Sequence, residues 1–306
     1  MTRIGLDDTG LSLVDEGAVA VEQTLSSLAQ SVDRARACGF DCSRVSWAFE
    51  IQSATGVPLW SRLFEDPDLD RDITTFFSQT MDQMQTLDDW VPTLAVHDCG
   101  GASLENAPGI AAVAANPDIF APGLVTGIQT GRSGSIPVVL EDGDSPVDLE
   151  FVNLPDHVLG LARMLLRECG EADMPGLAAI AFPAIRFADH IWSQTNRFVG
   201  GLGAVRSQLL LSLAGLNDFA PRVFADETQS NNRIAKLASY AGITISPESP
   251  RTHRNRSAMA ERDAEFEGST IRCEWHVKLH PTHNRIHFAV AGATVFVGLF
   301  ADHLTV

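Results

Sequence analysis

Residues 272–288 read RCEWHVKLHPTHNRIHF, and this stretch determines how we interpret the C-terminal part of the chain. From Arg272 to Leu279 charged and apolar residues alternate, which is the period of a half-buried β-strand. The alternation resumes at Arg285, after a short turn that contains Pro281. A third apolar run follows at residues 294–300. The pattern therefore predicts a C-terminal three-stranded antiparallel meander.

Strand alternation would place five charged or titratable side chains on one face of this meander. They are Glu274, His276, Lys278, Arg285 and His287. Histidine or glutamate could move the proton of an RNA 2′-hydroxyl, while lysine and arginine could stabilise the charge that builds on phosphate. These five are our candidate catalytic residues. The alternative is structural, because an antiparallel sheet commonly turns one polar face to water.

The same segment raises the question of zinc. His276, His280, His283 and His287 are close in sequence, and Cys273 precedes them. Their spacing fits none of the usual pairs of Cys or His ligands, and strand alternation does not bring all four histidines to one point. We therefore expect no metal and no cofactor.

Upstream of the meander, residues 244–268 are polar and rich in Ser, Pro, Arg and Glu. This composition predicts an exposed, flexible loop. Its basic run contributes Arg251, Arg254 and Arg256 as candidate nucleic-acid-binding residues, since arginine binds phosphate. The alternative is a solvated linker whose charge is offset by the acidic residues that follow.

The remaining patterns predict an α+β fold. Helical periodicity marks residues 16–38, 70–87, 156–169 and 203–214, and a hairpin with the acidic turn 141–144 joins two strands. We expect an acidic α+β region, 1–172, with helices and a small antiparallel sheet. A second region, 173–306, would hold helices, the loop and the meander. Gly127, Gly131 and Gly134 flank Arg132, but they lack the Lys-Ser/Thr of a phosphate-binding loop, so we assign no such loop there.

Charge is divided unevenly along the chain. The formal net charge is −17, yet residues 231–306 carry nine basic and seven acidic side chains and six of the nine histidines. We therefore expect no bulk binding to duplex DNA and none to membrane, while RNA remains a candidate partner for the C-terminal part. Five sparsely placed cysteines and the lack of an apolar leader predict a cytoplasmic protein without a disulfide framework.

Three segments of the C-terminal part carry a resemblance. Residues 273–279 (CEWHVKL), 284–288 (NRIHF) and 297–304 (VGLFADHL), preceded by AFPAIRF at 181–187, resemble the tail of uncharacterised bacterial proteins associated with phage-defence or mobile-element loci. The strand order and the Lys…Arg-Ile spacing are also loosely similar to the basic sheet of RelE-type mRNA-cleaving toxins. This chain lacks the small size and strongly basic character of those toxins.

Two functional hypotheses follow from the residues and the resemblance. The first is an interaction subunit of a bacterial defence or mobile-element system, which acts through a protein partner. The second is a nuclease-like, RNA-cleaving effector that uses the C-terminal sheet.

Overall fold

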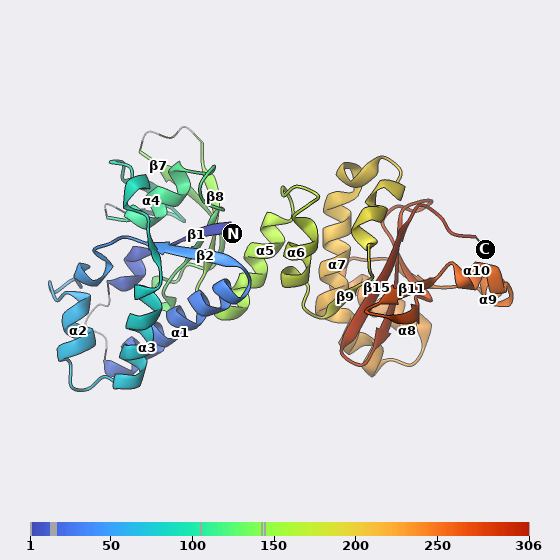
Figure 1. Ribbon diagram of the computed structural model, residues 1–306, viewed down its shortest axis with the longest axis horizontal. Coiled ribbons are helices and arrows are strands. Elements are labelled where there is room, and N and C mark those ends of the chain that lie inside the picture. The colour runs from blue at the N-terminus through green and yellow to red at the C-terminus, as the bar shows by residue number, and fades with distance from the viewer. Residues whose placement is uncertain (1, 13–16, 105, 142, 144, 306) are drawn as a thin grey trace. The chain divides into compact units, whose positions relative to one another are not determined.

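The computed structural model describes residues 2–12, 17–104, 106–141, 143 and 145–305. The chain divides into two compact units, the first ending at Met164 and the second beginning at Leu165 (Figure 1). This division lies eight residues before the boundary predicted at 172/173. In both units helices and strands are mixed, as the sequence predicts.

The described residues of unit 1 contain a sheet of eight strands in the order β3-β2-β1-β6-β8-β7-β4-β5. The strands are β1 (Thr2–Leu6), β2 (Phe40–Arg44), β3 (Gln85–Thr86), β4 (Val96–Cys99), β5 (Ala102–Leu104), β6 (Gly123–Val125), β7 (Gly134–Leu140) and β8 (Val147–Val152). Neighbours are parallel from β3 to β8 and antiparallel from β8 to β5. The predicted small antiparallel sheet therefore corresponds only to β8, β7, β4 and β5; the whole sheet is larger, and its other half is parallel. The antiparallel β7–β8 pair confirms the predicted hairpin, and Asp142 and Asp144 of its turn lie outside the described residues.

Helices connect the parallel strands and cover the sheet. They are α1 (Ala18–Ala37), α2 (Leu59–Glu65), α3 (Arg71–Asp82), α4 (Pro108–Ala115) and α5 (Val158–Leu165), with short 3-10 turns η1 (Asp8–Leu11), η2 (Ala48–Glu50), η3 (Asp88–Trp90), η4 (Ile128–Thr130) and η5 (Pro155–His157). α1 joins β1 to β2 and packs against α3, while α4 packs against β1 and β6 (Figure 1). The close approach of α4 to β1 requires Gly5, since a Cβ there would lie 2.5 Å from Val113.

This topology fixes where a ligand site is expected in unit 1. β1 lies between β2 and β6, and all three strands run parallel. Ligands of open α/β sheets bind outside the carboxyl ends of the strands, at the point where connections diverge to the two sides. That point is the end of β1 at Leu6.

The described residues of unit 2 contain a five-stranded sheet in the order β10-β13-β14-β15-β9 and a separate β11–β12 hairpin. The strands of unit 2 are β9 (Ile185–Phe187), β10 (Ile245–Pro247), β11 (Asp263–Phe266), β12 (Ser269–Arg272), β13 (Trp275–Lys278), β14 (Arg285–Ala291) and β15 (Thr294–Ala301). β13, β14 and β15 are consecutive antiparallel neighbours in the middle of the larger sheet. The predicted meander is thus part of a wider sheet, to which β9 adds a parallel edge.

The helices of unit 2 are α6 (Met174–Ala181), α7 (Gly201–Asp226), α8 (Ser230–Ala241), α9 (Pro250–Arg254) and α10 (Arg256–Ala260), with the 3-10 helix η6 (Ile191–Arg197). α7 packs against β14 and β15. Its Phe224 meets Trp275 and Phe288 edge-on, at ring-centroid distances of 5.1 and 6.1 Å. The apolar residues of the alternating pattern therefore form the core beneath α7.

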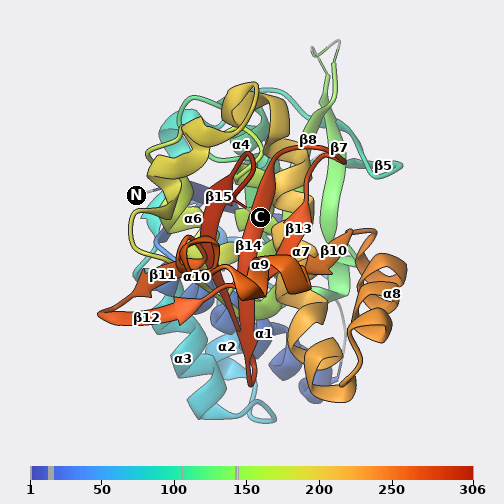
Figure 2. The same cartoon turned by 90° about the vertical axis from the view of Figure 1, so that its right-hand side faces the viewer.

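The prediction of a loop without secondary structure at 244–268 is wrong. This segment contains β10, α9, α10 and β11, and in Figure 2 the two short helices lie in front of the strands of unit 2. Ser249 caps α9 and Asn255 caps α10. The side chain of Arg262, only 3% exposed, pairs with Glu248. Polar composition was misleading here because helix caps, a buried ion pair and a few buried apolar side chains, such as Ile245, Ala258 and Met259, order the segment.

Two further findings concern membrane-spanning helices and disulfide bonds. Across the residues described, no helix combines the length and the apolar character that crossing a membrane requires. Each of the five cysteines, all within the described part of the chain, is a free thiol.

Candidate functional site

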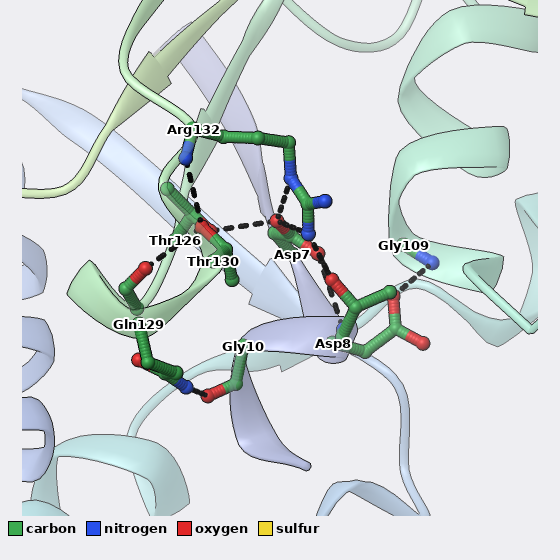
Figure 3. Close-up of polar contacts among 10 residues, drawn as sticks. Asp7, Asp8, Gly10, Gly109, Thr126, Gln129, Thr130 and Arg132 are labelled. Atoms are coloured by element: carbon green, nitrogen blue, oxygen red, sulfur yellow. Dashed lines mark hydrogen bonds and ion pairs between the residues drawn. The ribbon is translucent and has the colours of Figure 1, made fainter. Parts of the chain in front are cut away.

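The segment Asp7-Asp8-Thr9-Gly10 follows β1 directly and forms the polar site drawn in Figure 3. The backbone N–H of Asp7 donates to the carbonyl of Val125 over 2.8 Å, which continues the pairing of β1 with β6. The chain then turns into η1, and the Asp7 side chain accepts from the N–H of Thr9. Two adjacent carboxylates are thereby held at the switch point of the sheet.

Asp7 is fully buried, and its carboxylate is surrounded by donors. Oδ1 accepts from the Thr9 hydroxyl at 2.6 Å, and Oδ2 accepts from the Thr126 hydroxyl at 2.6 Å. Arg132 donates to Oδ2 from Nε at 3.0 Å and from Nη2 at 2.8 Å. Every oxygen of Asp7 is used by the protein itself, so this residue ties β1 to the loop after β6.

That loop, residues 126–132, is the glycine-flanked segment for which the sequence suggests no phosphate-binding role. η4 and the left-handed Gly131, with φ of 68°, turn Arg132 back toward Asp7. Arg132 also donates to the Thr9 hydroxyl, and Gln129 donates to the carbonyl of Gly10 (Figure 3). The structure uses the loop as a clamp on residues 7–10.

Asp8 differs from its neighbour although it is only 4% exposed. Its Oδ1 accepts from the N–H of Gly109 at 2.9 Å, at the start of α4. Gly109 must be glycine, because a Cβ would lie 2.1 Å from the carbonyl oxygen of Leu6. Burial, followed by the charge of Asp7, raises the pKa of Asp8 to about 7, against the opposing effect of the Gly109 N–H. This carboxyl therefore exists in both protonation states near neutral pH.

Asp8 lines a pocket of about 810 Å³ in unit 1, within the size range of small-molecule sites. Apolar groups of the wall include Trp47, Ile51, Leu94 and Pro108. Its polar groups are Asp8, Thr9, Ser12, Gln52, Thr93, Asn106 and Glu141. Among the described residues of the lining there is no lysine or arginine. The pocket is thus polar and acidic, with an aromatic side chain at its wall.

The sequence pattern did not identify this site. The available signal was the short buried run Ile4-Gly5-Leu6 followed at once by Asp7 and Asp8, ahead of a helical pattern. Such a strand–loop–helix unit places its loop at the carboxyl edge of a parallel sheet. Because the region was interpreted as antiparallel, that edge was not considered.

In unit 2 the structure brings together four of the five candidate catalytic residues. His276 pairs in register with His287, and Lys278 pairs with Arg285, so these side chains share one face of the β13–β14 pair. Glu274 precedes β13, is exposed, and lines a hollow of about 300 Å³ with Trp275 and other residues. No ion pair or hydrogen bond of its side chain to the histidines occurs within the described residues.

The carboxylate beside the two histidines belongs to Glu248, whereas the sequence pattern predicts Glu274. It follows β10, and its Oε1 lies 3.6 Å from Nδ1 of His276 and 3.6 Å from Nδ1 of His287. Burial raises the pKa of Glu248, but His276 and Arg262 more than offset this and bring it to about 2. Burial, followed by His276, lowers the pKa of His287 to about 3. The carboxylate is therefore charged and the buried imidazole neutral.

The three candidate nucleic-acid-binding residues lie apart from this cluster, on the outside of the two short helices. Arg251 and Arg254 belong to α9 and Arg256 begins α10, and all three are exposed. Nε of Arg254 donates to the carbonyl of Pro250. Their exposure leaves the prediction of phosphate binding open to experiment.

Comparisons with protein-family models, with curated proteins and with solved structures find no match for this chain. The two polar sites are therefore the basis on which a function can be proposed.

Proposed function

We propose that unit 1 is an enzymatic unit that binds a small polar molecule at the end of β1 and uses Asp8 as its acid–base group. The observation that carries this proposal is the position of Asp8, a carboxyl with a pKa of about 7 on the wall of a pocket at the carboxyl edge of parallel strands. A group that titrates near the working pH is suited both to accept and to donate a proton during a reaction.

The chemistry of the pocket wall restricts the ligand. Two acidic side chains, Asp8 and Glu141, line it together with hydroxyl and amide groups. The guanidinium of Arg132 is already paired with the carboxylate of Asp7. An uncharged or cationic molecule with hydroxyl or amino groups fits this wall better than a free phosphate does, and Trp47 offers a ring face to stack on or to hold a cation.

The two adjacent carboxylates have different roles in this proposal. Asp7 and Arg132 fix the loop and keep residues 7–10 in place. Asp8 keeps one oxygen on the N–H of Gly109, while Figure 3 marks no hydrogen bond or ion pair of its other oxygen to the residues drawn. That second oxygen is the one we assign to proton transfer.

The sequence-based hypotheses remain predictions beside this proposal. An interaction subunit that acts through a protein partner is compatible with a ligand pocket in unit 1. An RNA-cleaving effector requires a phosphate to reach His276 and His287, and the His287 side chain is only 2% exposed. Asp8 is also buried, but it lines a cavity of about 810 Å³ with room for a small molecule, and this favours unit 1 as the place of catalysis.

The proposal can be tested by thermal-shift titration of the full chain with nucleosides, polyols and small amines, each beside its phosphorylated counterpart. We expect uncharged or cationic compounds to stabilise the protein. Trp47→Ala should abolish the rise in melting temperature that the ligand causes. Asp8→Asn should remove the pH dependence of that rise around pH 7. Asp33→Asn on the exposed side of α1 is the control and should leave the shift unchanged. Stabilisation by phosphorylated compounds alone, or shifts that survive both pocket substitutions, would contradict the proposal.

A further inference from the structure

Three side chains with metal-ligating atoms meet on the polar face of β13 and β14. Glu248, His276 and His287 each offer one ligand atom within 4.8 Å of the others. Two ligands of one tetrahedral zinc ion, with bonds of ~2.1 Å, lie about 3.4 Å apart. The 3.6 Å separations of Glu248 Oε1 from the two Nδ1 atoms are close to that value. They are longer than ordinary hydrogen bonds, which end at about 3.2 Å.

Among the described residues, four buried atoms of this cluster lack hydrogen-bond partners. Neither ring nitrogen of His287 has a hydrogen-bond partner in the described part of the chain, and the same holds for Nδ1 of His276 and Oε1 of Glu248. Buried polar atoms of native proteins are nearly always paired with protein, water or an ion. The clustering of these atoms points to one common partner rather than to three separate ones.

We propose that Glu248, His276 and His287 bind one divalent transition-metal ion. Two imidazoles and one carboxylate form the ligand set of catalytic zinc sites and of non-haem iron sites, in which further coordination positions stay open. The imidazole donors favour zinc, iron or a similar ion over magnesium and calcium, which prefer oxygen ligands.

Arg262 is compatible with this ligand set. Its Nη2 donates to Oε2 of Glu248 over 3.3 Å, and its Nη1 donates to the carbonyl of Ala258 over 2.6 Å. Its Nε lies 3.2 Å from Oε1 as an ion-pair contact without a hydrogen bond. A carboxylate oxygen carries two lone pairs, so Oε1 keeps a lone pair for the ion. Ligating carboxylates commonly have such an outer hydrogen-bond partner.

Sequence spacing missed the site for an identifiable reason. Two of the four histidines that the pattern grouped, His280 and His283, lie at the exposed turn and stack on each other with centroids 3.8 Å apart. The third ligand is a glutamate 28 residues before His276, which only the pairing of β10 with β13 brings near. No linear motif records that pairing.

The His280–His283 pair at the turn supplies the control for the experiment, because histidines outside the cluster can capture zinc on their own. The full-length chain is treated with a chelator, dialysed, and titrated with Zn²⁺ by calorimetry. Co²⁺ replaces zinc in a parallel titration, so that its visible absorption reports coordination by nitrogen and oxygen. Mg²⁺ serves as a second comparison. Circular dichroism checks the fold of each variant.

We expect one tight zinc ion per chain, retained in a His280→Ala/His283→Ala double variant. Glu248→Gln and His276→Gln should each lower zinc affinity at least tenfold and change the Co²⁺ spectrum. His276→Gln is the safer variant, because the His276 side chain is 13% exposed whereas that of Glu248 is 6% exposed. The proposal is overturned if the folded wild-type chain binds no zinc, if binding disappears in the double variant, or if the folded His276→Gln variant binds zinc as tightly as wild type. Tight binding of sulfate in the absence of metal would also overturn it.

Discussion

The two units each bury a polar cluster, and the clusters differ in how completely the protein satisfies them. At the end of β1 the carboxylate of Asp7 is bound by Arg132 and by the hydroxyls of Thr9 and Thr126. On the face of β13 and β14, His287 has no hydrogen-bond partner among the described residues although it is equally deep. The paired carboxylate of Asp7 stabilises the fold, whereas several buried polar atoms that lack hydrogen-bond partners and lie together indicate a ligand.

The largest effect is expected from breaking the pairing of Asp7. Asp7→Asn leaves Arg132 without its charged partner in a nearly buried position, since the Arg132 side chain is 13% exposed. Removing one member of a buried ion pair typically costs 3–5 kcal/mol, so we expect unit 1 to lose about 4 kcal/mol of its free energy of unfolding. Urea unfolding followed by circular dichroism measures this loss.

Asp33→Asn is the matched control, because Asp33 pairs with Arg36 at 3.9 Å while its side chain stays 49% exposed. That substitution should change the free energy of unfolding by less than about 1 kcal/mol. Equal losses in the two variants would show that the network at the end of β1 is not the structural clamp we describe.

The second-largest expected effect is the pH dependence of stability that Asp8 contributes. In the folded chain burial, followed by the charge of Asp7, raises the pKa of Asp8 from its ordinary value of 3.8 to about 7. Its stabilising contribution is therefore fully present below pH 3.8, declines as the pH rises, and is lost once the pH passes 7. A difference of about three pKa units corresponds to up to about 4 kcal/mol. Asp8→Asn should remove this decline and make the chain more stable than wild type above pH 7.

Thermal unfolding at several pH values between 4 and 9 measures this difference. Asn keeps an oxygen for the Gly109 N–H, so the comparison isolates the titrating proton. Parallel pH profiles for wild type and Asp8→Asn would refute the assignment of Asp8 as the group that titrates near neutrality.

The third effect concerns the two faces of β13. Trp275 packs against Phe224 on the apolar face, and Arg233 lies 5.9 Å from the Trp275 ring. Trp275→Ala should cost unit 2 about 2–3 kcal/mol, since Trp275 is half-buried and the loss for a buried tryptophan is larger. Leu211→Ala on the exposed side of α7 is the control and should cost far less. A small loss for Trp275→Ala would mean that the polar face, rather than the apolar face, stabilises the sheet.

The smallest effect tests why residues 250–260 are ordered. Asn255 accepts from the N–H of Ala258 and caps α10, so Asn255→Ala should cost about 1 kcal/mol. Trypsin should then cut the variant faster than wild type after the exposed residues Arg254 and Arg256. Arg262, which is 2% exposed, should remain uncut in both. Rapid cleavage of the wild-type chain throughout 250–262 would instead support the flexible loop that the composition predicts.

Local pattern predicted much of the structure, and long-range pairing accounts for what it missed. Alternation of Trp275 and Val277 with His276 and Lys278 gave the correct faces of β13, because side-chain direction in a strand is a local property. The parallel half of the first sheet was missed, because β1, β2 and β6 are short and find each other only through helical crossovers. Asp8 and Glu248 were missed for the same reason, since each gains its surroundings from residues distant in sequence.

The comparison between the two clusters is tested most directly by hydrogen exchange of the chelator-treated chain, with and without Zn²⁺, followed by mass spectrometry. We expect zinc to slow exchange in peptides covering 245–262, 275–278 and 285–291, which surround Glu248, His276 and His287. Peptides covering 2–12 and 123–132 should exchange at the same rate in both samples, because the carboxylate of Asp7 is already paired within the chain. Unchanged exchange at 275–291, or slower exchange confined to 2–12 and 123–132, would contradict the account.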